Sequence, residues 1–95
     1  MAVREPVLKR IKEKIRQGHY VLTSHAEEEM DNDELSLADV ENSILTGKIE
    51  GQQKDRITGG WKYRIQGEAL AGDGLEGVAK IGATGKVVVI TVYRV

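Results

Sequence analysis

The chain has 95 residues, of which 40% are hydrophobic and 31% charged, and it contains no cysteine. These values are typical of one small globular domain over residues 1–95, and they exclude disulfide bridges, thiolate metal sites and cysteine nucleophiles. The net charge of −1 is unevenly distributed, because residues 1–18 hold six basic and two acidic side chains, residues 19–47 hold eight acidic and no basic ones, and residues 48–95 hold eight basic and five acidic ones. Local fields of either sign can therefore act on a partner.

The N-terminal segment MAVREPVLKRIKEK lacks the apolar stretch of a signal peptide. No window of the chain approaches the length of apolar sequence that a membrane span needs. We therefore expect a cytoplasmic protein with no membrane partner.

The first predicted helix lies in the segment EPVLKRIKEKIRQG at residues 5–18. Pro6 suits its first turn, and Gly18 suits the position just after its end. Apolar residues recur at helical spacing and form one stripe, made by Val7, Leu8, Ile11 and Ile15. The opposite face is basic, which is typical of a solvated surface and would also suit an anionic partner.

Residues 19–47 predict two further helices. The segment HYVLT at residues 19–23 is rich in β-forming residues and indicates either a strand or an extended linker. Ser24 followed by Glu27 matches a capping box and predicts a helix over residues 24–32. After the interruption DNDELS, Ser36 can cap a third helix that stops at Gly47.

After Gly47 the apolar residues alternate, which predicts four strands in the segments KIEGQQKD, WKYRIQGEAL, LEGVAKIGA and KVVVITVYRV. In the second segment an apolar set alternates with a polar set, namely Trp61, Tyr63 and Ile65 with Lys62, Arg64 and Gln66. The last segment is apolar on both faces over residues 87–92, which indicates a central or doubly covered strand. Turn signals at hairpin spacing join the strands. We therefore expect an α+β fold with N-terminal helices packed on one face of a four-stranded antiparallel sheet.

His25 is the first candidate for chemistry. If Ser24 is the cap, the positive end of the helix disfavours a protonated imidazole at His25, whereas Glu28 and Glu29 favour it. A histidine between such opposing influences suits a general acid or base. The alternative is a structural ring that packs on the sheet and bonds a backbone carbonyl.

A metal site would have to combine His25 with Glu28, Glu29 and the upstream His19. This spacing is common by chance, and no further strong ligand is marked by its position. No glycine-rich phosphate loop follows a strand either. We therefore expect no metal and no cofactor.

The second candidate is a cationic sheet face. Lys62 and Arg64 project together from one strand, and Lys80 lies on its expected neighbour. Arginine binds phosphate in a bidentate manner, and lysine stabilises its charge. Tyr93, near the chain end, offers a hydroxyl or a stacking ring. The alternative is that these cations only keep the sheet soluble and protect its edges.

Four blocks of the sequence, TSHAEEEM, LSLADVENSILTGKI, KYRIQGEAL and VVVITVYRV, together resemble a family of small prokaryotic proteins described only as a domain of unknown function. The resemblance covers nearly the whole chain from Tyr20 onward. That family is similar in fold to the RelE and BrnT toxins and other small metal-independent ribonucleases. The resemblance implies a RelE-like sheet and cleavage of RNA through activation of a ribose 2′-hydroxyl against the adjacent phosphate.

Two functions follow as hypotheses. The first is a metal-independent endoribonuclease, the toxin of a toxin–antitoxin pair, with RNA as substrate and an antitoxin as partner. In it His25 is the acid or base, Arg64 and Lys80 hold the phosphate, Tyr93 stacks a base or donates a proton, and Lys62 binds substrate. Because the chain is mildly acidic and has DNDE where related sequences carry arginine, its positive charge must be concentrated locally.

The second hypothesis is a non-catalytic module that binds a basic protein through the acidic surface of residues 27–41, with His25 structural. A homodimer through an edge strand or the last strand is a further expectation for either function.

Overall fold

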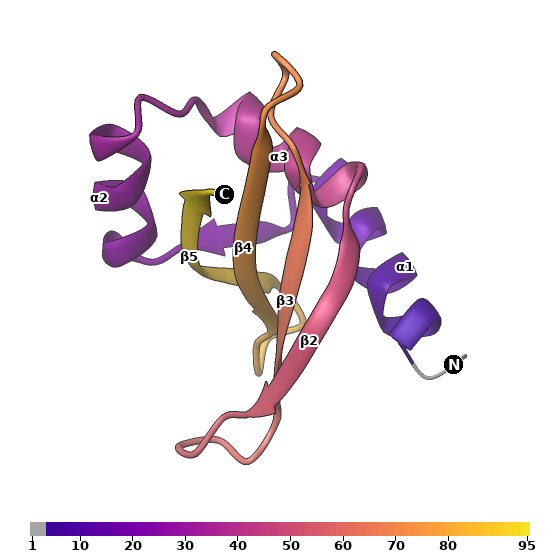
Figure 1. Cartoon of the computed structure of the whole chain (residues 1–95). Helices are drawn as coiled ribbons and strands as arrows, with labels where there is room; N and C mark the ends of the chain where they lie inside the picture. The colour runs from indigo at the N-terminus through magenta and orange to yellow at the C-terminus, as the bar shows by residue number, and fades with distance from the viewer. Residues whose placement is uncertain (1–3) are drawn as a thin grey trace.

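The computed structural model describes residues 4–95 and shows an α+β fold (Figure 1). Residues 1–3 of the predicted domain lie outside the described part of the chain. In chain order the elements are α1 (Arg4–Arg16), β1 (Tyr20–Leu22), α2 (Ser24–Asn32), α3 (Leu37–Leu45), β2 (Lys48–Lys54), β3 (Trp61–Glu68), β4 (Gly74–Ile81) and β5 (Val87–Arg94).

The sheet has five strands in the order β1-β5-β4-β3-β2, so the prediction of four antiparallel strands was wrong. The fifth strand comes from residues 19–23, for which the sequence allowed either a strand or an extended linker. Within this segment β1 pairs in parallel with β5, and Tyr20 lies opposite Val87. The other neighbours are antiparallel, as expected. This pairing also makes β5 an internal strand, which agrees with its apolar sequence.

Helices α1 and α3 cover one face of the sheet, which we call the covered face (Figure 1). Alternate residues of the strands bury their side chains there, including Ile65, Leu75, Val89 and Val92. At Gly67 the C-terminal end of α3 approaches β3 so closely that a Cβ would lie 1.9 Å from the carbonyl oxygen of Ser43. Only a glycine fits this contact between helix and strand.

Helix α2 does not join this layer, so the prediction that the N-terminal helices share one face is wrong for α2. It stands beside β5 (Figure 1), along the part of β5 that extends beyond its pairing with β1. Its N-cap is Thr23 and not Ser24, since the Thr23 hydroxyl accepts a hydrogen bond from the Ala26 amide at 3.1 Å. The same hydroxyl donates to the Ile90 carbonyl at 2.7 Å, which fastens the helix start to β5.

The ends of the other two helices agree with the sequence. Ser36 caps α3 in a capping box with Asp39. After α1, Gly18 has φ of +73°, and the amides of Gly18 and His19 donate to the carbonyls of Ile15 and Lys14. This pattern of bonds is a Schellman motif, which a glycine in the left-handed region completes.

Strand β5 contains a bulge at Ile90, between the pairs Ala79 with Val89 and Val78 with Thr91. The extra residue changes the phase of the alternation. As a result Val89 and Val92 both face the core, while Thr91 and Tyr93 project from the other face.

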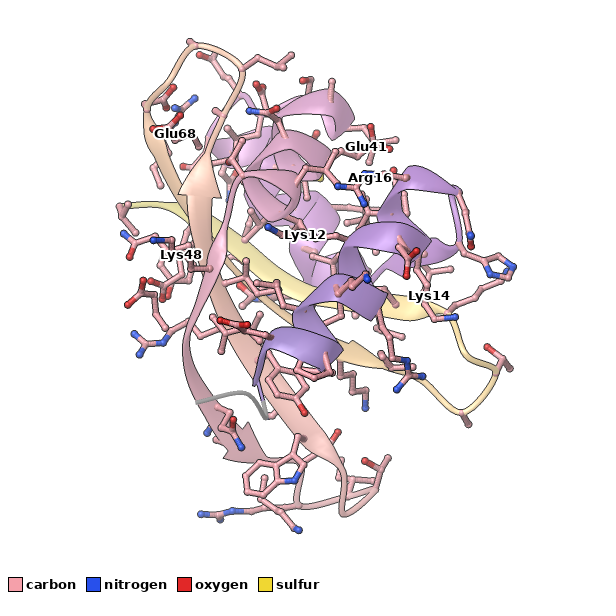
Figure 2. All side chains as sticks on the ribbon, turned by 90° about the vertical axis from the view of Figure 1, so that its right-hand side faces the viewer. Lys12, Lys14, Arg16, Glu41, Lys48 and Glu68 are labelled. Carbon is pink, nitrogen blue, oxygen red and sulfur yellow. The ribbon has the colours of Figure 1, made fainter. Side chains whose placement is uncertain are left out.

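The basic side chains of α1 lie on the helix layer. Figure 2 shows Lys12, Lys14 and Arg16 there, on the same side of the molecule as Glu41 of α3. The positive charge of α1 is therefore separate from the cations of the sheet. None of the helices within residues 4–95 combines the length and the apolar sequence needed to cross a membrane.

Candidate functional site

The face of the sheet opposite α1 and α3 carries the predicted site residues, and we call it the open face. In the sheet register Arg64 lies beside Val78, which lies beside Thr91, and Glu76 lies beside Tyr93. Residues paired in this way project from the same face of an antiparallel sheet. The open face is therefore lined by Lys62, Arg64, Glu76, Lys80, Thr91 and Tyr93.

Glu76 is the centre of one cluster on this face. Its residue is 7% exposed, and its carboxylate accepts a hydrogen bond from the Tyr93 hydroxyl. Arg64 Nη1 lies 3.7 Å from the same oxygen, Oε2, while Arg64 Nη2 donates to the Glu50 carbonyl at 3.1 Å. The buried carboxylate is thus partnered by a phenol and a cation, as burial of a charge requires.

Tyr93 stays protonated in this cluster. The hydrogen bond to Glu76 raises the pKa of the Tyr93 phenol, and partial burial and the charge of Glu29 add to the increase, whereas Arg64 opposes it. The phenol is therefore neutral at physiological pH, its proton is donated to Glu76, and its ring remains as the surface that a ligand could contact.

Glu29 of α2 is the centre of a second cluster. Its Oε1 accepts hydrogen bonds from the Thr91 hydroxyl and from the Val92 amide, the latter at 3.1 Å. His25 Nε2 lies 3.4 Å from the same oxygen, one helical turn earlier. The His25 side chain remains 64% exposed. The alternative, in which the His25 ring packs on the sheet, is therefore wrong. Because Thr23 is the cap, His25 is the second residue of α2 and not the first.

The two clusters meet on β5. Thr91 belongs to the Glu29 cluster and Tyr93 to the Glu76 cluster, and residues two apart on a strand project from the same face. Thr91 and Arg64 are separated by two strand spacings, about 10 Å. Tyr93 and Arg64 thus share the open face, and His25 reaches the β5 side of that face through Glu29, whereas the hollow beside Arg64 is lined from β2, β3 and β4 and not by His25.

Lys62 lies beside Arg64 at a hollow in the open face. The hollow has a volume of about 240 Å³. Its lining combines two cations with amide side chains and one apolar residue, from Gly51, Gln52, Gln53, Lys62, Arg64 and Val78. Since the side chain of Arg64 is 47% exposed, part of its guanidinium can reach a ligand in this hollow.

Lys80 lies on the same face but is bound to Asp55. Its Nζ is 2.6 Å from Asp55 Oδ2, and only 22% of the Lys80 side chain is exposed. The hydrogen bond from Lys80, followed by that from the Ile57 amide, holds the pKa of Asp55 well below its usual range. Lys80 therefore acts in a structural ion pair, which corrects the expectation that it is available to a phosphate.

The carboxylates that organise the face were not predicted as site residues. In β4 the polar residues Glu76 and Lys80 alternate with apolar residues, as Arg64 does in β3. This shared alternation is the signal that could have assigned Glu76 to the polar face of the sheet. The contact between Glu29 and Thr91 joins positions 62 residues apart, and no local pattern marks it. No three histidine, aspartate or glutamate side chains within residues 4–95 form a group that could hold a metal ion.

Residues 22–94 match the model of a family described as a domain of unknown function (DUF4258). The chain belongs to this family. This confirms the expected membership of a family described as a domain of unknown function, while the relationship to RelE and BrnT toxins stays a prediction. No curated protein and no solved structure matches the chain. The family description carries no activity, so function must be argued from the site.

Proposed function

We propose that this protein is a metal-independent endoribonuclease, the toxin of a toxin–antitoxin pair, with a fold related to RelE. The observation that supports it is that Glu76 holds Arg64 and Tyr93 together on one sheet face, while Glu29 connects His25 to Thr91, two residues from Tyr93 on the same strand. Metal-independent cleavage of a phosphodiester needs a group that moves a proton and a group that stabilises charge on the phosphate, which a histidine and an arginine can supply.

In the proposed reaction His25 accepts the proton of the ribose 2′-hydroxyl. The 2′-oxygen then bonds to phosphorus, the bond from phosphorus to the 5′-oxygen breaks, and the departing oxygen takes a proton from solvent. Glu29, 3.4 Å from the ring, stabilises the imidazolium that forms at His25. Glu29 is itself held by Thr91 and Val92, so it acts as a positioning residue.

Arg64 and Lys62 would bind the phosphate. Both line the hollow of about 240 Å³, and the guanidinium keeps donors beyond those directed at Glu76 and Glu50. Charge developing on the phosphate oxygens is stabilised by fixed cations of this kind. Tyr93 would offer its ring to a base, because its hydroxyl proton is engaged with Glu76. Lys80 is left out of this set because of its ion pair with Asp55.

The experiment is cleavage of a fluorescently labelled RNA by the purified full chain in the presence of EDTA. Replacement of His25 by alanine should lower the cleavage rate on the order of 10²- to 10⁴-fold. The matched control is His19→Ala, since His19 is exposed ahead of β1 and should leave the rate unchanged. Intact RNA after incubation with the folded wild-type protein would contradict the proposal.

A second candidate function, binding of a basic protein, is favoured by the solvent face of α2. Glu27, Glu28 and Asp31 are exposed there, and within residues 4–95 none of them takes part in an ion pair. Unpaired like charges on one helix attract a cationic partner over a long range.

This candidate predicts that the triple variant E27K/E28K/D31K loses binding to an oligolysine peptide. The wild type should bind the peptide in a salt-dependent manner, as measured by fluorescence anisotropy. The triple change E5K/E13K/E68K, which shifts the net charge by the same amount and in the same direction at exposed positions outside α2, serves as the control and should retain binding. Unchanged binding by the α2 variant would exclude this role of the acidic surface.

A further inference from the structure

The single tryptophan of the chain is exposed at one end of the sheet. Trp61 is the first residue of β3, and 44% of its surface is accessible. Opposite it in the register is Lys54, whose ammonium lies 4.7 Å from the centroid of the ring. A large aromatic side chain left exposed beside a cation is typical of a contact surface.

The turn between β2 and β3, at residues 55–60, is fixed by hydrogen bonds and an ion pair directly before Trp61. The Asp55 carboxylate accepts a hydrogen bond from the Ile57 amide at 3.0 Å and pairs with Lys80 at 2.6 Å. The Asp55 amide donates to the Gly60 carbonyl at 2.7 Å. Trp61 therefore presents its ring from a preorganised turn, which lowers the cost of binding.

Beside the ring lies a hollow of about 310 Å³, within the rough range of 300–1,000 Å³ for small-ligand sites. Its lining is Thr58, Gly60, Trp61, Lys80, Ile81, Gly82 and Ala83. Since Trp61 points toward the covered face and Lys80 toward the open face, the hollow wraps around the end of the sheet. A ligand in it can continue onto the surface where Lys62 and Arg64 lie.

We propose that Trp61, together with the exposed cations Lys54 and Arg56, forms a stacking platform for an unpaired base of single-stranded nucleic acid. The ring takes the base on the face not occupied by the Lys54 ammonium, and the cations take the adjoining phosphates. The inference rests on the proposed function, whose substrate class it names as single-stranded RNA. Duplex RNA is excluded because its bases are stacked on one another and cannot reach the ring.

The position of the platform fits one continuous strand. Trp61 and Arg64 are three residues apart on β3, about 10 Å. A single strand crossing the end of the sheet could therefore contact the ring and the phosphate-binding cations together. The occupant that competes with this inference is a protein segment, for which the exposed Ile57 at the tip of the turn would be a contact.

The test is titration of the full chain with oligothymidylate, which contains no 2′-hydroxyl and so is not cleaved. Because Trp61 is the only tryptophan, its fluorescence reports stacking directly. We expect saturable quenching by the single strand, weakened by salt, and little quenching by a duplex of equal length. Trp61→Ala should weaken binding of a labelled oligonucleotide about tenfold or more, and Trp61→Phe should retain most of it.

The cations have a matched control. K54Q/R56Q should weaken binding in the same assay, whereas K9Q/R10Q, which removes equal charge from α1, should not. If Trp61→Ala fails to fold, the second measurement is the NMR signal of the Trp61 indole N–H in the wild-type protein. Stacking of a base on the ring must change its chemical shift when the oligonucleotide is added.

Absence of quenching and of any shift at saturation would overturn the platform, and so would equal binding of the duplex. Quenching without cleavage of RNA would keep the platform and remove the nuclease function. Cleavage of RNA without quenching of Trp61 would support the nuclease function and exclude the stacking platform.

Discussion

The two faces of the sheet are built from alternate residues of the same strands, yet they are held by different forces. The covered face buries Ile65, Leu75 and Val89 under α1 and α3. The open face is organised by carboxylates, with Glu76 and Glu29 each holding two or more donors from other segments. Apolar burial is non-directional, whereas hydrogen-bonded carboxylates fix the positions of individual groups.

From this difference we expect substitutions on the covered face to lower mainly folding stability, and substitutions on the open face to lower mainly activity. Residues of the covered face contribute area removed from water, so their loss should unfold the protein and leave the chemistry of the folded fraction unchanged. Residues of the open face contribute geometry around His25 and Arg64, so their loss should change activity with a smaller effect on folding.

The largest effect is expected for Leu75→Ala on the covered face. Leu75 is completely buried, and truncation should lower the free energy of unfolding by about 2–5 kcal/mol. Urea denaturation followed by circular dichroism measures this value. The control is Leu70→Ala, a residue 63% exposed, which should change stability by less than about 0.5 kcal/mol. Equal costs at both positions would contradict the assignment of the core.

Gly67→Ala tests the contact between α3 and the same face. The added methyl group would meet the Ser43 carbonyl at 1.9 Å, so helix or strand must shift, at a cost of about 1–3 kcal/mol or more. Gly77→Ala, in β4, is the matched control because its nearest new contact is 3.4 Å. A lower urea midpoint for Gly67→Ala than for Gly77→Ala is the expected result, and the reverse order would show that α3 is not packed as described.

Thr91→Val probes the open face at nearly constant shape. The change removes the hydroxyl that donates to Glu29 and should cost about 0.5–1.5 kcal/mol in stability. RNA cleavage should fall several-fold more than this stability loss explains, because Glu29 loses a group that holds it beside His25. Thr84→Val, at an exposed turn position, should change neither quantity. A stability loss without any change in cleavage would make the Glu29 cluster purely structural.

The smallest effect concerns pH and the covered face. Burial, followed by the hydrogen bond to Glu41, raises the pKa of Tyr20 to about 12 from 10.0. The neutral phenol therefore contributes its full stability below pH 10, and this contribution is lost as the pH rises through 10 toward 12. Tyr20→Phe should flatten part of the alkaline decrease in melting temperature, which thermal unfolding between pH 9 and pH 12 measures. An unchanged decrease in Tyr20→Phe would exclude this linkage.

Local patterns predicted most of the elements and part of the site. The Ser36 cap, the end of α1 at Gly18 and the alternation around Arg64 depend on neighbours within a few residues, so the sequence alone carries them. The placement of Lys62 and Arg64 on one face was predictable for the same reason. The choice of Thr23 over Ser24 as cap was not, because the Thr23 hydroxyl is also bonded to Ile90 at the far end of the chain.

The sequence by itself thus determined the order of helices and strands and which residues share a face of each strand, since these follow from the periods of helix and strand. Tertiary structure alone decided that β1 joins β5, that Lys80 is bound to Asp55, and that Glu29 connects His25 to Thr91. These contacts link distant positions, and their free energies depend on burial and distance that exist only once the chain has folded.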